Sequence, residues 1–279
     1  MIRLVTDSTC DLPQEWRNRL DLTVVPINIQ FGTETYLEGV TIDESTFYRR
    51  VNELGMIPKT SQPAPGVLAD VYRRLGAAGD EVLSLHITGK LSGTVNSAEQ
   101  ARKMVADQVR VQVFDSLAGS AGLGFMVWEA HTLAQAGATM EDILARLSYI
   151  REHIQIALTL KTLKYAQMSG RVTTIQHVLA SLLDLKPIIT LEAGSLDVTG
   201  RRRTRRQALA RLLDLVEERV GTGPLNLAVI HAHAPQDARQ VLGQAQLRFR
   251  CEHSFVAPLA TSIAANLGPG TLGVAAYPL

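Results

Sequence analysis

Residues 81–106, EVLSLHITGKLSGTVNSAEQARKMVA, pass from an apolar strand pattern through a short turn into an amphipathic helix pattern. The same alternation fills the first half of the chain, with further strands predicted at about 2–9, 22–31 and 110–116. Alternating strands and helices are typical of a parallel sheet covered by helices. The nearly continuous apolar strands also suit a sheet that is buried on both faces.

The pattern changes after about residue 155. A helical stripe at 175–183 ends before a proline, and residues 187–200 predict a hairpin that turns at 193–195. We therefore predict an α/β protein of two domains. Residues 1–155 form a parallel-sheet α/β domain that carries the Ser-Gly-Thr turn, and residues 156–279 form an α+β domain with a mixed sheet. Because no linker rich in Gly, Pro or Ser separates them, we expect a ligand cleft between the domains.

The composition excludes several classes of protein. The chain has 279 residues, of which 46% are hydrophobic, and 28 Lys+Arg nearly balance 27 Asp+Glu, so no nucleic-acid partner is predicted. Cys10 and Cys251 have no CxxC partner, which favours a reducing compartment. The N-terminus lacks the layout of a signal peptide, and no apolar run approaches the roughly 20 residues of a membrane span. A cytoplasmic protein without stable membrane insertion is expected.

The Ser92-Gly93-Thr94 turn stands where the third strand meets its helix. The first N–H groups of a helix have no partner within the helix and attract anions, most readily at the carboxyl edge of an open sheet. Ser92 and Thr94 add hydroxyl groups, and Gly93 allows a close approach of the backbone. The turn therefore suits a carboxylate or a phosphate. The alternative is that Ser92 or Thr94 only caps the helix.

Two other stretches favour an anion. PKTSQPAPG, residues 58–66, is stiffened by prolines and presents Thr60 and Ser61, whose two hydroxyls can hold one ligand oxygen. Its alternative is an ordinary surface turn. Gly170-Arg171 precedes the expected helix at 175–183, where the helix dipole disfavours an arginine unless an anion or an acidic side chain compensates it.

Six segments together resemble one family. They are VTDSTCDLP, KTSQPAPG, LSGTVNSAEQA, FDSLAGSAGLG, SGRVTTIQHVLASLLDLKPIITLEAG and NLGPGTLGV, and they follow the order and spacing of the DegV family from about residue 3 to residue 277. The resemblance implies a two-domain α/β protein that holds one long-chain fatty acid with its acyl chain buried and its carboxylate near the surface. Some members of the family are the carrier subunit of a bacterial fatty acid kinase.

The resemblance also implies a set of site residues. Thr60 and Ser92 match the family's carboxylate-binding threonine and serine, and Arg171 matches an arginine of the head-group region. Asn266 stands where the family usually has a histidine, before Gly268-Pro269-Gly270. An Asn side chain donates a neutral hydrogen bond but does not titrate, so a role of that histidine in phosphoryl transfer or kinase binding is in doubt here.

Ser61, Gly93 and Thr94 complete the predicted carboxylate site through hydroxyl and backbone N–H groups. The function expected is that of a non-enzymatic carrier, without a cofactor, that presents the carboxylate to a separate ATP-dependent fatty acid kinase for acyl-phosphate formation. One alternative is an enzyme acting on a small anionic phosphoryl or acyl substrate in the same cleft, although no general base stands beside the turn. Another is a regulator that senses lipid through a protein partner.

Other signals are weaker. GRRRTRRQ, residues 200–207, predicts a solvated helix face, and it is a weak nucleic-acid site because it lacks interleaved aromatic residues. It would suit an acidic kinase partner. No metal site is expected, because His231-Ala-His233 and Cys251-Glu-His253 supply two ligands each.

Two Asp-Ser pairs, at residues 7–8 and 115–116, follow predicted strands and are attributed to helix capping. The resemblance places both pairs beside the family's cleft. The order of the serines and histidines along the chain shows no evident catalytic triad, but order alone does not exclude one.

Overall fold

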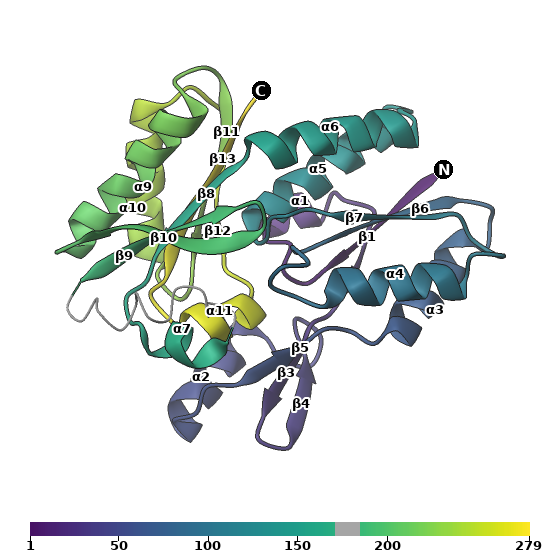
Figure 1. Cartoon of the computed structure of the whole chain (residues 1–279), viewed down its shortest axis with the longest axis horizontal. Helices are drawn as coiled ribbons and strands as arrows, with labels where there is room; N and C mark the ends of the chain where they lie inside the picture. The colour runs from purple at the N-terminus through teal and green to yellow at the C-terminus, as the bar shows by residue number, and fades with distance from the viewer. Residues whose placement is uncertain (171–184) are drawn as a thin grey trace. The chain divides into compact units, whose positions relative to one another are not determined.

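The computed structural model describes residues 1–170 and 185–279, which divide into two compact units, Met1–Arg151 and Glu152–Leu279 (Figure 1). Arg171 and the helix expected at 175–183 lie outside the described residues. The predicted ligand cleft between the domains stays a prediction.

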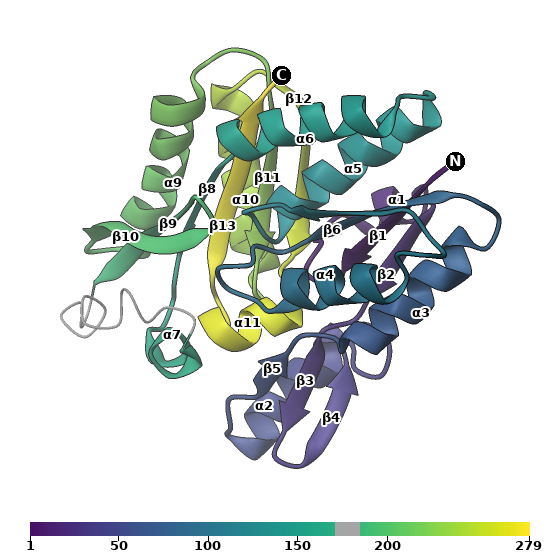
Figure 2. The same cartoon turned by 45° about the vertical axis from the view of Figure 1, so that its right-hand side comes forward.

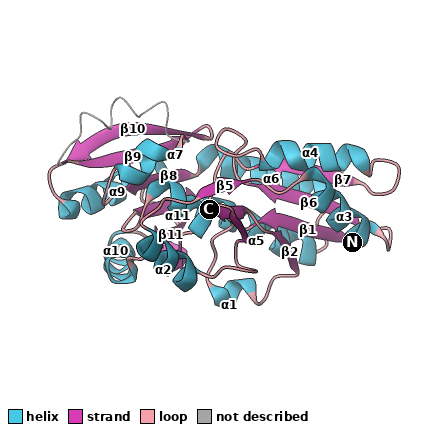
Figure 3. Cartoon of the chain, turned by 90° about the horizontal axis from the view of Figure 1, so that it is seen from below, coloured by secondary structure: helices cyan, strands magenta, loops and turns pink. Residues whose placement is uncertain are grey.

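The main sheet of the first unit is parallel, as the alternating pattern predicts. Its strand order is β2 (Leu22–Val25), β1 (Ile2–Asp7), β6 (Glu81–His86) and β7 (Val111–Asp115), and all neighbours run in the same direction (Figure 3). The strand predicted at 22–31 is in fact two strands. Pro26, which has no N–H for a central ladder, separates β2 from β3 (Asn28–Phe31), and β3 joins another sheet.

Helices cover both faces of this sheet. Figures 1 and 2 show α3 (Pro65–Gly76) and α4 (Thr94–Met104) on one side, with α5 (Ala121–Gln135) and α6 (Met140–His153) on the other. One buried cluster joins α3 and α4 to β1, β2, β6 and β7. The short helix α1 (Gln14–Arg17) follows β1. The carboxyl ends of β1, β6 and β7 therefore meet at one edge, with the loops that lead into the helices.

A small antiparallel sheet, which the sequence pattern did not predict, is inserted between β2 and α3. It has the order β4 (Glu34–Leu37), β3, β5 (Lys59–Ser61), and α2 (Glu44–Leu54) packs beside it (Figure 2). Phe31 and Phe47 join sheet and helix with ring centroids 5.9 Å apart. The insertion matters because β5 carries the predicted Thr60 and Ser61.

The second unit is built on the predicted mixed sheet. Only β11 and β12 are parallel, and all other neighbours are antiparallel. The strand order is β10 (Ser195–Arg202), β9 (Lys186–Glu192), β8 (Gln155–Thr159), β13 (Leu272–Pro278), β11 (Leu225–His231) and β12 (Cys251–Pro258). The predicted hairpin is confirmed as β9–β10, whose turn residues Ala193 and Gly194 both have positive φ.

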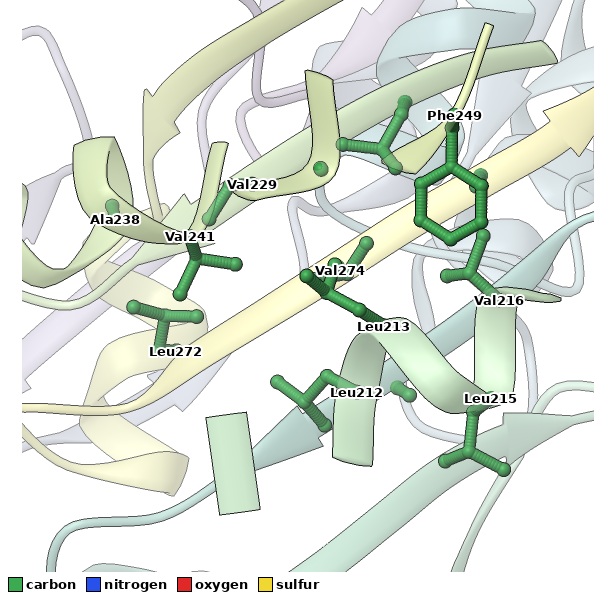
Figure 4. Close-up of a cluster of buried hydrophobic side chains, with 14 of the residues drawn as sticks. Leu212, Leu213, Leu215, Val216, Val229, Ala238, Val241, Phe249, Leu272 and Val274 are labelled. Atoms are coloured by element: carbon green, nitrogen blue, oxygen red, sulfur yellow. The ribbon is translucent and has the colours of Figure 1, made fainter. Parts of the chain in front are cut away.

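Two helices bury the main apolar cluster of this unit. A capping box starts α9 (Arg205–Val220), and α10 (Pro235–Arg248) begins with a proline, which suits the first position of a helix. Figure 4 shows Leu212 of α9, Val241 of α10 and Val274 of β13 in one cluster. The short helices α7 (Lys164–Ser169) and α11 (Thr261–Leu267) pack against each other.

Candidate functional site

The Ser-Gly-Thr turn connects β6 to α4, and its two hydroxyls lie together. Ser92 Oγ is 2.8 Å from Thr94 Oγ1 and accepts the backbone N–H of Thr94 at 3.3 Å. Gly93 holds the N-cap position and has no side chain to cap the helix, while Ser92 Oγ accepts the N–H of the first helical residue, so the capping alternative applies in part to Ser92. The turn thus combines two hydroxyls with the start of an 11-residue helix, which is a suitable set of donors for an oxyanion.

The loop after β5 contacts this turn. A Cβ atom built on Gly93 would lie 2.8 Å from Cδ and Nε2 of Gln62, so the Gln62 side chain occupies that space. Glycine at 93 allows a close approach, as expected, but the approaching group is the end of the Gln62 side chain, which would have to move if a larger residue stood at 93. The contact brings together the two hydroxyl-bearing segments that the sequence singled out separately.

Thr60 and Ser61 lie on opposite faces of β5, because successive side chains alternate along a strand. Asn28, the partner of Ser61 in β3, donates from Nδ2 to Ser61 Oγ at 3.4 Å and to the Gln62 carbonyl at 3.1 Å. The expectation that both hydroxyls hold one ligand oxygen is therefore not supported by the geometry. Asn28 fixes the loop on one side, and half-buried Thr60 is presented on the other.

Thr88 anchors the Ser-Gly-Thr turn to the sheet. Its carbonyl accepts the N–H groups of Leu91 and Ser92, each at 3.2 Å, and its hydroxyl accepts the N–H of Lys90 at 3.2 Å. Its own N–H donates to the carbonyl of Ala118 at 2.8 Å, in the loop that follows β7. The position of Ser92 is thus set by hydrogen bonds around one fully buried residue.

The two Asp-Ser pairs do not cap helices, contrary to the sequence interpretation. Asp7 Oδ2 accepts the N–H of Ile87 at 3.0 Å, and the Asp115 carboxylate accepts the N–H of Gly89 at 3.2 Å. Helices α1 and α5 begin several residues further along the chain. Both carboxylates instead tie the connection after β6 to the neighbouring strands β1 and β7.

The ionisable groups near this edge are held in fixed states. Burial acts to raise the pKa of Asp7, but hydrogen bonds from His86, Thr9 and Ile87 and the charge interaction with His86 outweigh it, so the pKa lies below its ordinary value. Burial raises the pKa of the Cys10 thiol far above its ordinary value. Asp7 is therefore ionised at neutral pH, whereas Cys10 is a protonated thiol and a poor nucleophile.

In the second unit, Asn266 lies near the end of α11 and is half-buried. Its Nδ2 donates to the Ser262 carbonyl at 2.8 Å, which uses one of the two amide hydrogens. The Gly-Pro-Gly turn that follows is closely packed. A Cβ on Gly268 would meet the Tyr165 ring at 2.6 Å, and a Cβ on Gly270 would meet the Lys161 side chain at 2.5 Å.

Gly170 ends α7 in the left-handed conformation and is exposed, and the next residue, Arg171, is outside the described residues. The contribution of Arg171 and Asn266 to a head-group site with Ser92 stays a prediction. Sequence reasoning missed Asn28, because nothing in its pattern announced the small sheet. Gln62 lies within the loop at 58–66 that the sequence singled out, but no contact was predicted for its side chain.

The described parts of the chain contain neither a candidate metal-binding group of side chains nor a candidate membrane-spanning helix. Among residues 1–170 and 185–279, no three or more His, Cys, Asp or Glu side chains form a group that could hold a metal ion. None of the described helices combines the length and hydropathy needed to cross a membrane.

The fold and the site define a class of protein. It is an α/β protein with hydroxyl-bearing loops at the carboxyl edge of a parallel sheet. The family model of DegV, described as an uncharacterised protein family, matches residues 1–279, so the chain belongs to the DegV family. Protein DegV of Bacillus subtilis is 32% identical over 275 residues, which cover 98% of each chain.

Solved structures agree with this assignment. A DegV family protein from Thermus thermophilus, whose structure is described as showing fatty acid binding, has a TM-score of 0.93 and 36% identity and covers 100% of this chain and 99% of its own. DegV from Bacillus subtilis, described as a fatty acid binding protein, has a TM-score of 0.91 and 31% identity, with coverage of 100% and 99%.

Proposed function

We propose that this protein binds one long-chain fatty acid, with the acyl chain buried and the carboxylate held by Thr60 and Ser92. The observation that carries the proposal is the contact between Gln62 and Gly93, which joins the two hydroxyl-bearing loops. The fatty acid binding described for the relatives from Thermus thermophilus and Bacillus subtilis supports the choice of ligand.

The hydrogen bonds of Ser92 suit an acceptor ligand. Its Oγ accepts the N–H of Thr94 and lies within hydrogen-bonding distance of the buried Thr94 hydroxyl. When Thr94 donates both hydrogens, the two lone pairs of Ser92 are filled and its own O–H is directed to another acceptor. A carboxylate is such an acceptor, and the two incoming bonds polarise the Ser92 hydroxyl toward it.

The acyl chain supplies most of the binding free energy in this proposal. Burying about 14 methylenes at ~0.8 kcal/mol each contributes roughly 11 kcal/mol before the cost of association is subtracted. The polar loops then select the orientation and the head group. Arg171 and Asn266 are proposed, from the resemblance, to lie in the head-group region.

We further propose that the protein is cytoplasmic and presents the carboxylate to an ATP-dependent fatty acid kinase. Both cysteines are free thiols, as in a reducing compartment. The segment 200–207 leaves Arg201, Arg203 and Arg206 exposed, while Arg205 pairs with Asp237 at 2.8 Å. This basic surface suits an acidic partner. The charge reversal of the exposed Arg203 and Arg206 to Glu, which leaves the pair of Arg205 with Asp237 intact, is expected to slow association with the kinase, and unchanged association would remove the basis for this docking surface.

Mass spectrometry of an organic extract from natively produced protein tests the ligand. One fatty acid per chain is the expected result, and the extract also defines the acyl chain. An empty protein that hydrolyses small phosphoesters or acyl esters would instead support the enzyme alternative. A pull-down with and without fatty acid separates a lipid-sensing regulator from a simple carrier.

A further inference from the structure

A continuous chain of four buried polar side chains runs through the first unit. The Tyr72 hydroxyl donates to Ser84 Oγ at 2.8 Å, Ser84 Oγ lies 2.7 Å from His86 Nε2, and His86 Nδ1 lies 3.0 Å from Asp7 Oδ2. All four residues have no exposed surface. They come from α3, β6 and β1, and Tyr72 and Asp7, at the two ends of this hydrogen-bonded series, are far apart in sequence.

The donors and acceptors of this chain match when His86 donates from Nδ1. Ser84 Oγ accepts from Tyr72 and has a hydrogen that can be donated to His86 Nε2, while Nδ1–H donates to Asp7. This hydrogen bond from His86 is one of the causes that lower the pKa of Asp7 against the effect of burial.

The order Ser84, His86, Asp7 has the contacts of a hydrolase triad, but its surroundings exclude that role. A nucleophilic serine must reach the substrate, whereas Ser84 is completely buried and its oxygen already accepts from Tyr72. The three groups therefore do not act on a substrate. Their effect must pass through the backbone to which they are attached.

That backbone leads directly to the proposed carboxylate site. Asp7 Oδ2 accepts from both His86 Nδ1 and the N–H of Ile87. Ile87 is followed by Thr88, whose carbonyl accepts the N–H of Ser92. Thus Asp7 fixes the peptide immediately before the residue that anchors the Ser-Gly-Thr turn.

We propose that the Tyr72–Ser84–His86–Asp7 chain positions the Ser92 hydroxyl and so sets the preference of the site for a carboxylate over an uncharged head group. The proposal rests on the proposed fatty acid binding. His86 and Asp7 are positioning residues, which hold the turn in place without contacting the ligand. A displaced turn weakens directional hydrogen bonds to the head group, while burial of the acyl chain is unaffected.

The test is the ratio of affinities for palmitate and 1-hexadecanol, measured with delipidated full-length protein at about pH 8, where the acid is ionised. Both compounds compete with cis-parinaric acid. His86→Leu removes the donor to Asp7 and leaves the Asp7 side chain itself unchanged. His86→Asn is the conservative variant, because its amide nitrogen can replace Nδ1 as the donor.

His86→Leu is expected to lower the palmitate-to-hexadecanol affinity ratio at least about fivefold, and His86→Asn to keep it within about twofold of the wild-type ratio. Tyr277→Phe is the matched control in the second unit, since Tyr277 is also fully buried and its hydroxyl accepts from Asn226 at 2.7 Å. It is expected to lower Tm without changing the ratio.

If folded His86→Leu has the same palmitate-to-hexadecanol affinity ratio as the wild-type protein, the proposal is overturned. The four hydrogen-bonded side chains then have a purely structural role. If that variant does not fold, Tyr72→Phe, which removes only the terminal hydroxyl, is expected to lower the ratio about three- to fivefold, and a ratio within about twofold of the wild-type value overturns the proposal instead. Failure of the wild-type protein to bind palmitate would be a separate result, since it would contradict the proposed function itself.

Discussion

Two regions of the molecule, one in each unit, differ in what they bury. At the carboxyl edge of the first unit's parallel sheet, Asp7, His86 and Thr88 are fully buried and joined by hydrogen bonds. The cluster under α9 and α10 in the second unit consists of apolar side chains, such as Leu212 and Val241 (Figure 4). Hydrogen bonds are directional and fix the positions of loops, whereas apolar packing is non-directional and mainly adds stability.

Because of this difference, we expect substitutions in the two regions to change different properties of the protein. Removing a polar contact at the edge of the first sheet should change which head group is bound. Removing apolar volume in the second unit should change the free energy of unfolding and leave the head-group preference as it is. The four predictions below test that separation.

The largest effect is expected for Leu212→Ala, which empties part of the second unit's cluster. Leu212 has no exposed surface, so the loss of its side chain should lower the free energy of unfolding by about 2–5 kcal/mol in urea titrations. Leu247→Ala is the control, because Leu247 is 92% exposed and its truncation should change stability by less than about 0.5 kcal/mol. Similar losses in both variants would contradict the assignment of the core.

A smaller effect, on binding alone, is expected for Ser92→Ala and Thr60→Val. A hydrogen bond to a charged group contributes about 1.5–3 kcal/mol, so each change should weaken fatty acid binding roughly 10- to 100-fold in calorimetric titrations with Tm nearly unchanged.

Ser61→Ala provides the matched control, because Ser61 lies on the other face of β5 and contacts Asn28. Its affinity should stay within about twofold of the wild-type value. If the double variant of Thr60 and Ser92 still binds with wild-type affinity, the site assignment is wrong.

The third prediction concerns the charge of Asp7. Because its pKa is lowered by folding, Asp7 contributes stability at pH values above its unfolded pKa of about 3.9, and this contribution is lost as the pH falls through the lower folded pKa. Asp7→Asn should therefore lower the free energy of unfolding at pH 7 by about 1–3 kcal/mol.

The pH dependence provides the check on this prediction. Below about pH 4, the stability of the wild-type protein should fall more steeply than that of Asp7→Asn, and the two should converge. Urea titrations at successive pH values measure the difference. Parallel curves at all pH values would show that the ionised state of Asp7 adds nothing to stability.

Much of the fold could be predicted, because strands and helices depend on local periodicity. The strands of the main parallel sheet, the hairpin β9–β10 and the helix that begins at Pro235 all follow from patterns within about 15 residues of sequence. Pro26 was present in the expected strand at 22–31, and its missing N–H was a signal that the strand breaks there.

The polar site was predictable only in part, because its contacts are long-range. The turn at 92–94 and the loop at 58–66 were recognised by their composition, but the contact of Gln62 with Gly93 depends on the small inserted sheet. The ring of His86 reaches Asp7 across 79 residues of sequence. Neither residue type nor spacing indicates such a pair, since adjacent parallel strands are brought together only by the complete fold.

The smallest effect separates the two hydroxyls of the turn. Thr94→Val removes the hydroxyl beside Ser92 with little change in volume, so Ser92 loses one hydrogen-bonding partner but keeps its own hydroxyl for the ligand. Fatty acid affinity should fall about 3- to 10-fold, less than for Ser92→Ala. Thr94→Ser retains the hydroxyl and should restore the affinity to within about twofold. A loss in Thr94→Ser as large as that in Thr94→Val would mean that the methyl group of Thr94, and not its hydroxyl, positions Ser92. The head-group preference of the first unit would then depend on packing, as stability does in the apolar cluster of the second unit, and not on directional hydrogen bonds.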